Sequence, residues 1–389
     1  MINKNKRKIL VLIPHFLPGY KMGGPLTSII NMIDKLSPDY YFEVLTSDRD
    51  MGDDKPYDNI KFNVWIKNSK YNIYYVNSDI LMLFRLIKCI NSSSVDVVYL
   101  NSLFNPVFSM FVVFANKIGL LKAKKIILSP RGETYDEALD FKKNKKRLFL
   151  WLAKKVNLYK NIYWHTSTVV EKQSVIKNMN VDSKMIHVAL NLSQNTSINE
   201  FDLNNVVTKH YKEGLHIVFL SRISKDKNII FTFDILKEIK TKVVFDIYGP
   251  IEDEFIWDLC KEKISNLPGN IVVEYKGTVP KDKVKKVFSE YDLMFLPTYA
   301  ENFGHVIVES LSVGTPVLLS DNTPWRELES AGFGWDLPLN KPELFIKAIE
   351  IMSNLSEEDK IKNKEKVRKD ILVLLNNPET LDANRRLFE

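Results

Sequence analysis

Cysteine and histidine are scarce in this 389-residue chain, which has two cysteines and six histidines. The two thiols, Cys89 and Cys260, stand far apart in the sequence. So few and so widely separated cysteines support neither a disulfide framework nor a cysteine-rich zinc site. A disulfide-stapled domain is therefore excluded, and a reducing cytoplasm is the expected compartment.

Long hydrophobic runs are also missing. The basic segment Lys4–Lys8 leads into the short apolar run Ile9–Ile13, which Pro14 ends, so we expect no secretory signal. The longest apolar stretch, Leu103–Leu121, contains polar residues and is entered through Pro106. We interpret it as a buried helix and not as a membrane span. A soluble cytoplasmic protein is expected, or one attached to the inner face of the cytoplasmic membrane.

The rest of the composition is that of an ordinary globular protein, with 45% hydrophobic and 26% charged residues. A length of 389 residues favours two domains over one core. The net charge of +7 is uneven: residues 1–190 hold 29 Lys and Arg against 16 Asp and Glu, or +13, and residues 191–389 hold 26 against 32, or −6. The change of sign falls close to the expected domain boundary.

The densest basic segment is Lys142–Lys155, whose aromatic and aliphatic positions suit a helix lying on an anionic membrane surface. The alternative is a solvated basic helix packed on its own domain. Nucleic acid is not an expected partner, because no nucleic-acid-binding motif accompanies the charge. The segment therefore predicts either a peripheral membrane contact or an ordinary surface helix.

Short β-branched or aromatic runs alternate with helix-like segments in both halves, which predicts parallel sheets covered by helices on both faces. The expected strands are Lys8–Pro14, Tyr41–Thr46, Val95–Leu100, Lys125–Ser129 and Ile162–Thr166 in the first half, and Leu215–Leu220, Val243–Tyr248, Ile271–Tyr275, Leu293–Pro297 and Pro316–Ser320 in the second. The predicted fold class is α/β, with two doubly wound, Rossmann-like domains that face each other across a cleft and bind ligands at the carboxyl ends of the strands.

The domain boundaries follow from composition. Residues 191–213 are rich in Asn, Ser and Thr and form the expected linker. The linker separates an N-terminal domain, 1–190, from a C-terminal domain, 214–389, whose last helices could cross back to the first domain.

Two carboxylates eight positions apart stand where an apolar strand ends and a helix begins. The run Tyr291–Thr298 predicts a buried strand and His305–Val313 predicts the helix, so Glu301 lies in the connecting loop. Helical side chains lean toward the helix N-terminus, which directs Glu309 back at that loop. A carboxylate accepts two hydroxyl hydrogen bonds at once, the pair that a ribose or hexose diol offers. The spacing favours a site for a nucleotide sugar.

Backbone donors separate the two acids. The N–H groups of Asn302, Phe303 and Gly304 lie between them, and Gly304 allows a ligand to approach the chain closely. The alternative is that one acid caps the helix while the other is solvated.

A second loop carries two cations. Arg222 follows the strand Leu215–Leu220, and Lys227 stands at the start of a predicted helix with a buried apolar stripe. A departing nucleoside diphosphate gains negative charge, which a fixed guanidinium and ammonium stabilise most in the transition state. The alternative is a pair of ordinary surface cations.

A glycine pair follows the first strand. Gly23 and Gly24 precede Pro25, which suits a first helical turn, and free N–H groups at such a helix end can meet an anion. The segment is not the dinucleotide fingerprint, because the loop is too long and has a single glycine pair. It predicts a phosphate or acceptor loop, or only a turn.

Three segments together resemble glycosyltransferase family 4, whose members are retaining enzymes of GT-B fold. They are Glu301–Val317, similar to the family's E-x7-E segment, Ser221–Asn228, and more weakly Gly23–Pro25. The resemblance implies that Glu309 holds the ribose, that Glu301 and the backbone of residues 302–304 hold the sugar, and that Arg222 and Lys227 hold the diphosphate. Arg222, Lys227 and Glu301 are the implied catalytic residues.

The resemblance also implies further contacts and the reaction. Gly249, Thr278 and Val279 are expected beside the nucleotide, and His15, Asn101, Arg131 and Glu133 are candidates for the acceptor side. The implied activity is metal-independent, retaining transfer of a hexose without a cofactor. Its co-substrate is a nucleotide-diphosphate sugar, with uridine the commonest base, and its acceptor is a glycan or polyprenyl-diphosphate-linked glycan of a bacterial surface polysaccharide such as O-antigen, capsule or exopolysaccharide.

The sequence departs from the family at one place. Many members carry a histidine after the strand that corresponds to Val95–Leu100, where this chain has Asn101 and Ser102. An amide preserves a hydrogen bond but cannot transfer a proton. A non-catalytic binder of nucleotide sugars or glycans, a sugar-nucleotide epimerase and a phosphorylase remain alternatives.

Overall fold

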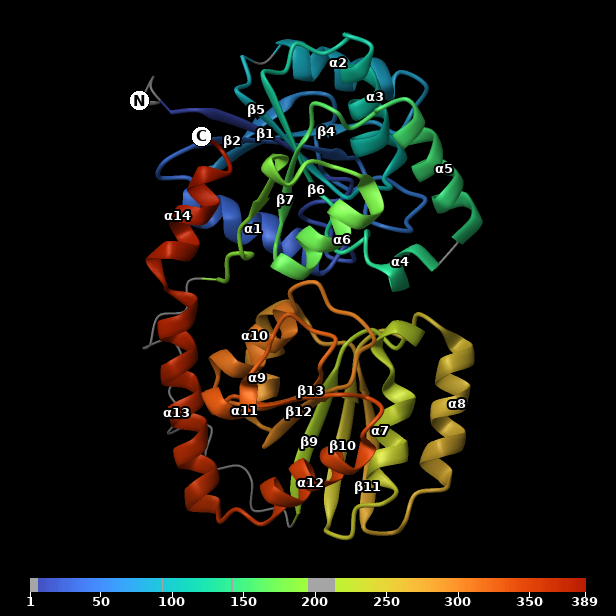
Figure 1. The fold of residues 1–389 in the computed structure, drawn as a ribbon, viewed down its shortest axis with the longest axis vertical. Helices are drawn as coiled ribbons and strands as arrows, with labels where there is room; N and C mark the ends of the chain where they lie inside the picture. The colour runs from blue at the N-terminus through green and yellow to red at the C-terminus, as the bar shows by residue number, and fades with distance from the viewer. Residues whose placement is uncertain (1–5, 93, 141–142, 195–213) are drawn as a thin grey trace. The chain divides into compact units, whose positions relative to one another are not determined.

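The computed structural model describes residues 6–92, 94–140, 143–194 and 214–389. The chain divides into two compact units: unit 1 comprises Met1–Asn195 and Pro378–Glu389, and unit 2 comprises Thr196–Asn377. Each unit is an α/β layer structure with its own parallel sheet (Figure 1). The predicted fold class, two doubly wound α/β domains, is confirmed.

The sheet of unit 1 has the strand order β3-β4-β2-β1-β5-β6-β7-β8 in the described residues. All neighbours are parallel except β3 and β4. The strands are β1 (Lys8–Leu12), β2 (Tyr41–Ser47), β3 (Trp65–Lys67), β4 (Tyr71–Val76), β5 (Val97–Asn101), β6 (Lys125–Ser129), β7 (Tyr163–Thr166) and β8 (Ile186–Val188). The antiparallel edge and the strands β4 and β8 were not predicted.

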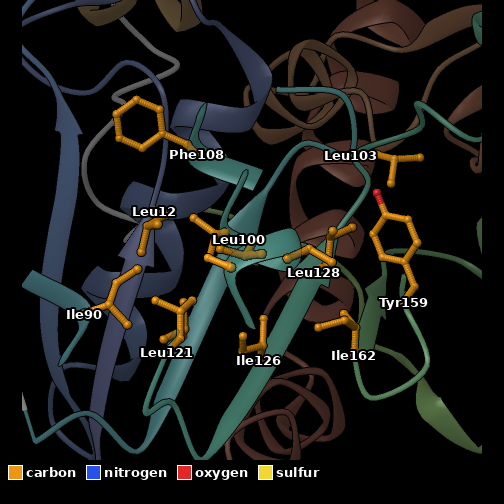
Figure 2. Close-up of a cluster of buried hydrophobic side chains, with 14 of the residues drawn as sticks. Leu12, Ile90, Leu100, Leu103, Phe108, Leu121, Ile126, Leu128, Tyr159 and Ile162 are labelled. Carbon is orange, nitrogen blue, oxygen red and sulfur yellow. The ribbon is translucent and has the colours of Figure 1, made fainter. Parts of the chain in front are cut away.

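Helices cover both faces of this sheet. Alternate residues of β1 divide between two hydrophobic clusters: Leu10 and Leu12 belong to one, and Ile9 and Val11 to the other. The first cluster, part of which Figure 2 shows, includes side chains from α2, α3, α5 and α6. The second includes side chains from α1. The helices are α1 (Gly24–Leu36), α2 (Met82–Ser92), α3 (Val112–Lys117), α4 (Asp136–Asp140), α5 (Lys143–Lys155), α6 (Val169–Met179) and α14 (Pro378–Arg386).

Unit 2 has an all-parallel sheet of order β11-β10-β9-β12-β13-β14 in the described residues. Its strands are β9 (Leu215–Leu220), β10 (Val243–Tyr248), β11 (Ile271–Gly277), β12 (Leu293–Leu296), β13 (Val317–Ser320) and β14 (Gly334–Leu337). Its helices are α7 (Ile229–Leu236), α8 (Glu254–Ser265), α9 (Val284–Ser289), α10 (His305–Ser312), α11 (Leu328–Ala331), α12 (Pro342–Ser353) and α13 (Glu357–Leu375). β9 is central, as a doubly wound sheet requires.

The predicted linker begins too early. Asn191, Leu192 and Ser193 are buried in unit 1, and Leu192 belongs to its second hydrophobic cluster. Burial of Leu192 and a hydrogen bond from Asn31 Nδ2 to its carbonyl at 2.9 Å anchor this segment, which composition alone did not indicate. The predicted linker positions 195–213 lie outside the described residues.

The C-terminus belongs to unit 1 and not to unit 2. Asn384 on α14 donates from Nδ2 to the Leu190 carbonyl at 2.9 Å, and the Tyr40 hydroxyl donates to the Arg385 carbonyl at 3.0 Å. Phe388 is fully buried against Tyr40 and other rings of unit 1. The predicted C-terminal domain therefore ends about a dozen residues before the chain does.

The apolar stretch Leu103–Leu121 is not one buried helix. It begins with a π-helical turn, Pro106–Phe111, which Asn105 caps by accepting two backbone N–H bonds, and continues as α3. Phe114 and Ile118 are about half exposed, so the stretch is amphipathic. None of the helices in the described part of the chain has the length and apolar content needed to span a bilayer.

Candidate active site

The loops after β9 and β12 are tied to each other in unit 2. Asn228, left-handed with φ 53°, precedes α7 and donates from Nδ2 to the Pro297 carbonyl at 3.0 Å. The Asp226 carbonyl accepts from the Tyr299 N–H and the Thr298 hydroxyl, both at 2.9 Å. These bonds fix the loop that carries the two predicted cations beside the loop that carries Glu301.

Lys227 and Glu301 form a buried ion pair. The Lys227 ammonium donates to Glu301 Oε2 at 3.0 Å, and Asp226 Oδ2 lies 3.5 Å from the same nitrogen. Lys227 is 8% exposed. Burial alone would lower its pKa, but the Glu301 and Asp226 carboxylates raise the pKa above its usual value. The lysine is therefore held as a cation at the end of the sheet.

Arg222 is more exposed than Lys227 and has other partners. Its guanidinium contacts Glu252, and Asp226 Oδ2 lies 3.6 Å from it. Asp226 therefore stands between the two cations, and its other oxygen accepts from Ser224 Oγ at 2.5 Å. Burial would raise the pKa of Asp226, but Lys227, Ser224 and Arg222 lower it. The two cations are joined through one ionised carboxylate.

The segment from Glu301 to α10 is built around a glycine. Gly304 is left-handed with φ 76°, and a Cβ there would lie 2.5 Å from Ile307 Cδ1 and 3.2 Å from Glu301 Cγ. A larger residue would therefore displace the carboxylate as well as strain the backbone. The Asn302 N–H, predicted as a donor to ligand, donates to Glu301 Oε1 at 3.1 Å in this structure. It orients the acid.

Glu309 lies about one turn into α10 (His305–Ser312). Burial raises the pKa of its carboxyl to about 7, although Lys281 and Lys285 act to lower it. Lys281 lies just before α9, and Lys285 lies in its first turn. A carboxyl group with this pKa titrates near neutrality and gains most from a ligand that offers hydroxyl donors to its ionised form.

Gly249 packs directly on the cation loop. Its φ is 136°, and a Cβ would lie 1.8 Å from the Ser221 carbonyl oxygen, so only glycine fits. The Gly249 N–H donates to the Gly277 carbonyl at 2.9 Å, and its own carbonyl accepts from the Tyr275 hydroxyl at 2.8 Å. Thr278 and Val279 follow β11 directly, next to this contact.

The glycine pair and His15 lie at one end of the sheet in unit 1. Gly23 precedes α1 with φ 62°, and α1 begins at Gly24. His15, just after β1, has Nδ1 2.9 Å from the Arg49 carbonyl and 3.2 Å from Ser47 Oγ. Because a carbonyl only accepts, the Nδ1 carries a proton, and in the neutral ring Nε2 is the acceptor.

Asn101 and Arg131 meet in the same unit. Asn101 Oδ1 accepts from Arg131 Nε at 3.2 Å and from Nη2 at 2.9 Å, while Asn101 Nδ2 donates to the Leu12 carbonyl at 3.3 Å. Arg131 Nη1 also donates to Asn191 Oδ1 at 2.6 Å. The amide that stands where the family has histidine therefore fixes an arginine.

Glu133 is turned to a different loop. Its carboxylate accepts from Ser102 Oγ at 2.9 and 3.0 Å, from the Phe104 N–H at 3.1 Å and from the Leu103 N–H. Burial raises the pKa of this carboxyl against the effect of those bonds. Glu133 and Arg131 are two residues apart, but their side chains bind different residues and do not form one site.

Known proteins are similar to this chain both in sequence and in fold. Residues 201–369 match the family model of group 1 glycosyl transferases. The matched segment lies within unit 2. The chain is 28% identical over 254 residues to an uncharacterized 41.2 kDa protein in the cps region of Klebsiella pneumoniae, covering 64% of this chain and 66% of that protein. It is 31% identical over 108 residues to an uncharacterized glycosyltransferase of Methanocaldococcus jannaschii, covering 27% and 26%. The matches thus span just under two thirds and about a quarter of those proteins.

Solved structures match nearly the whole chain. Anabaena Alr3699/HepE in complex with UDP-glucose matches with a TM-score of 0.65 and 13% identity, covering 98% of each chain. Sucrose-phosphate synthase from Thermosynechococcus elongatus matches with a TM-score of 0.69 and 13% identity, again covering 98% of each. The lipopolysaccharide outer core galactosyltransferase WaaB matches with a TM-score of 0.60 and 17% identity, covering 96% and 99%. At these identities the likeness establishes the fold, which is GT-B.

The sequence predicted candidate residues that lie in recognisable motifs, and it did not predict residues that only contact those candidates in the folded chain. The ion pair of Lys227 and Glu301 joins positions 74 apart, and both were predicted. Asp226, Glu252 and Asn191, which hold the predicted cations, were not. Their only sequence signal is that each lies in a loop just after a strand, which is too common to be diagnostic.

Proposed function

We propose that the chain is a retaining glycosyltransferase that moves a hexose from a UDP-sugar to a glycan or polyprenyl-diphosphate-linked glycan. The observation that carries the proposal is the buried contact of Lys227 with Glu301 at 3.0 Å, inside the segment that matches the glycosyl transferase family. One carboxylate for sugar hydroxyls and one cation for the leaving diphosphate are thereby fixed at adjoining points.

The donor is assigned to unit 2. Glu309 holds the ribose hydroxyls, and Glu301 with the backbone of residues 302–304 holds the sugar. Gly249, Thr278 and Val279 border the nucleotide. A charged acceptor with two oxygens suits a vicinal diol, and the close packing of Gly249 on Ser221 fixes the loop that carries Arg222.

Arg222 and Lys227 are assigned to the leaving diphosphate. Charge grows on the β-phosphate as the glycosidic bond breaks, and fixed cations stabilise it without reorganising at that moment. The reaction needs no general base from the chain if the departing phosphate takes the proton of the acceptor hydroxyl on the same face. No metal ion or cofactor is required in this scheme.

The acceptor is assigned to unit 1, with His15, Gly23, Gly24, Asn101, Arg131 and Glu133 as the candidate residues. Support for a surface polysaccharide comes from the similar proteins: one lies in a Klebsiella cps region, and WaaB is a lipopolysaccharide galactosyltransferase. O-antigen, capsule and exopolysaccharide all fit this description.

A peripheral membrane contact through α5 is part of the proposal. Leu148 and Trp151 are 59% and 57% exposed among cations, while Leu150 and Ala153 face the core. A helix with apolar and basic groups outward suits an anionic surface at the inner face of the cytoplasmic membrane.

Incubation with a panel of nucleotide sugars tests the function. Slow hydrolysis that releases free nucleotide indicates a transferase acting on water. Tight binding without release indicates a non-catalytic binder, and interconversion of the donor indicates an epimerase; either result would refute the proposed reaction. A Lys227→Ala variant of the same preparation controls for contaminating hydrolases, because its rate must fall with the assigned residue.

A further inference from the structure

The guanidinium of Arg131 is held by neutral side chains. Besides its bonds to Asn101 and Asn191, Nη2 donates to the Tyr99 hydroxyl at 3.3 Å. Four of the five N–H donors of the guanidinium are used in this way, and one on Nη1 has no partner among the described residues. All of the partners are amide or hydroxyl oxygens, which carry no charge to balance the cation.

Other arginines of unit 1 differ from Arg131. Arg49, Arg85 and Arg385 each contact a carboxylate, at 2.9, 2.6 and 2.9 Å. No carboxylate in the described ranges lies within ion-pair distance of Arg131, although this side chain is partly buried. A partly buried cation without an anion is costly unless a ligand supplies one.

The carboxylate of Glu171, which the charge of Arg131 influences, does not complete the site. Glu171 is fully buried, and the charge of Arg131 acts to lower its pKa, which burial raises. Its oxygens are bound by the Gly132 N–H at 2.6 Å and by the Ser167 N–H and hydroxyl at 2.7 and 3.0 Å. The carboxylate therefore fixes the backbone on either side and compensates Arg131 only from a distance.

The position of Arg131 is that of a ligand-binding residue. Asn101 ends β5, Arg131 follows β6, and Asn191 follows β8, so the cluster lies at the carboxyl ends of parallel strands. Arg131 is left-handed with φ 54°, a conformation unfavourable for a non-glycine residue. Ser193, two residues after Asn191, is 5% exposed and its hydroxyl has no partner among the described residues.

We propose that Arg131, oriented by Asn101, Tyr99 and Asn191, forms a subsite for an anionic group of the acceptor, either a phosphate or a sugar carboxylate. The Nη1 N–H without a partner among the described residues is the donor that such a group would use. This inference rests on the proposed function only in identifying the anionic group as part of the acceptor. The anion site itself does not depend on turnover.

The experiment uses the full chain with Arg222→Ala and Lys227→Ala, which removes the assigned donor diphosphate site. Thermal unfolding is followed with increasing inorganic pyrophosphate, which represents a lipid diphosphate, or glucuronate, which represents an acidic sugar. We expect one of these anions to raise Tm with its concentration, since a ligand of the folded state stabilises by mass action. A rise in Tm with pyrophosphate would indicate a lipid diphosphate as the anionic group, and a rise with glucuronate would indicate an acidic sugar.

Three added substitutions decide the site. Arg131→Gln should abolish the rise in Tm. Arg131→Lys should reduce the rise, because lysine keeps the charge but loses the planar set of N–H donors of the guanidinium. The exposed control Lys88→Gln should leave the rise unchanged. If the glutamine variant does not fold, the lysine variant decides. An undiminished rise with Arg131→Lys and Arg131→Gln, or no rise with any anion in the parent, overturns the proposal. A failed panel of nucleotide sugars would instead overturn only the proposed function.

Discussion

The candidate sites of the two units hold their cations in opposite ways. In unit 2, Lys227 contacts Glu301 at 3.0 Å and Asp226 at 3.5 Å, while Arg222 contacts Glu252 and lies 3.6 Å from Asp226. In unit 1, Arg131 contacts only neutral oxygens. The first pair of cations is fully compensated by the chain, and the second site is not.

The difference has a consequence for binding. Two cations and three carboxylates, Asp226, Glu252 and Glu301, sum to −1 at the donor site. If the donor binds as proposed, its diphosphate displaces carboxylates from Arg222 and Lys227, and the hydroxyls of its sugar replace the ammonium on Glu301. A ligand with both groups exchanges one set of contacts for another. At Arg131 an anion adds contacts without displacing any.

Replacing Arg222 or Lys227 by Ala should have the largest effect. If both act on the leaving diphosphate, each substitution should lower kcat by raising the activation free energy by roughly 3 kcal/mol, the scale of an oxyanion-hole donor. The donor KM should rise by a smaller factor. The double variant should lose less than the sum, because both cations act on one group. Steady-state kinetics with the exposed neighbour Lys225→Ala as control decide this. Additive losses confined to KM would reduce both residues to docking groups.

Glu309→Ala should weaken donor binding by about 1.5 to 3 kcal/mol, the range of a charged hydrogen-bond set. A 2′-deoxy donor should lose much of the difference between wild type and variant, since the ribose contact is already missing. Calorimetric titration with both donors measures this. Equal affinity of wild type and folded variant for the full donor would show that Glu309 does not hold the ribose.

The pH dependence of Glu309 gives a further comparison. Its pKa rises from 4.5 to about 7 in the folded chain, so between those values the folded state binds more protons. Stability should therefore fall as pH rises from 4.5 to 7, and Glu309→Gln should remove this slope. Donor affinity should rise through pH 7 as the carboxylate forms. Unfolding and binding measured across this range test both signs, and parallel slopes in wild type and variant would refute the assignment.

Asp226→Asn should tighten binding of the nucleoside diphosphate by up to about 1 kcal/mol, the scale of a partly exposed ion pair. The substitution removes the carboxylate that competes with diphosphate for both cations. Glu252→Gln is the matched variant for Arg222 alone and should have a smaller effect. Weaker binding in Asp226→Asn would mean that this carboxylate orients the cations more than it competes for them.

Chelation should have the smallest effect. Because Arg222 and Lys227 are assigned the role that a divalent cation has in other transferases, we expect activity to persist in excess EDTA. Initial rates with and without the chelator measure this. Complete loss, restored by magnesium or manganese, would require a metal at the diphosphate.

Local pattern was sufficient for most of the fold. The strands Lys125–Ser129 and Leu215–Leu220 were predicted to the residue, because a buried parallel strand is a short apolar run with sharp ends. The antiparallel β3 and the edge strand β8 were missed, since each has three residues and gives too little pattern. The boundary at residue 190 was placed too early, because the segment after it is anchored by the buried Leu192 side chain and by the bond from Arg131 to Asn191.

The candidate site divides in the same way. Glu301, Glu309, Arg222 and Lys227 could be predicted as site residues because their spacing and their loop positions are visible in the sequence. The partners that set their charge state were not, since Asp226 could equally have been a solvated acid and Glu252 lies 30 residues from Arg222. Asn101 was noticed as a departure from the family, but its bond to Arg131 appears only when β5 and β6 pair.

By itself the sequence determined the alternation of strands and helices, the two-domain α/β class and the positions of the charged loops, because these depend on periodicity and on residues close in sequence. Tertiary structure decided that α14 returns to unit 1, that Lys227 is paired with Glu301, and that no carboxylate of the described residues pairs with Arg131. Charge compensation depends on distances of a few ångströms between loops far apart in the chain, and only the packing of the strands sets those distances.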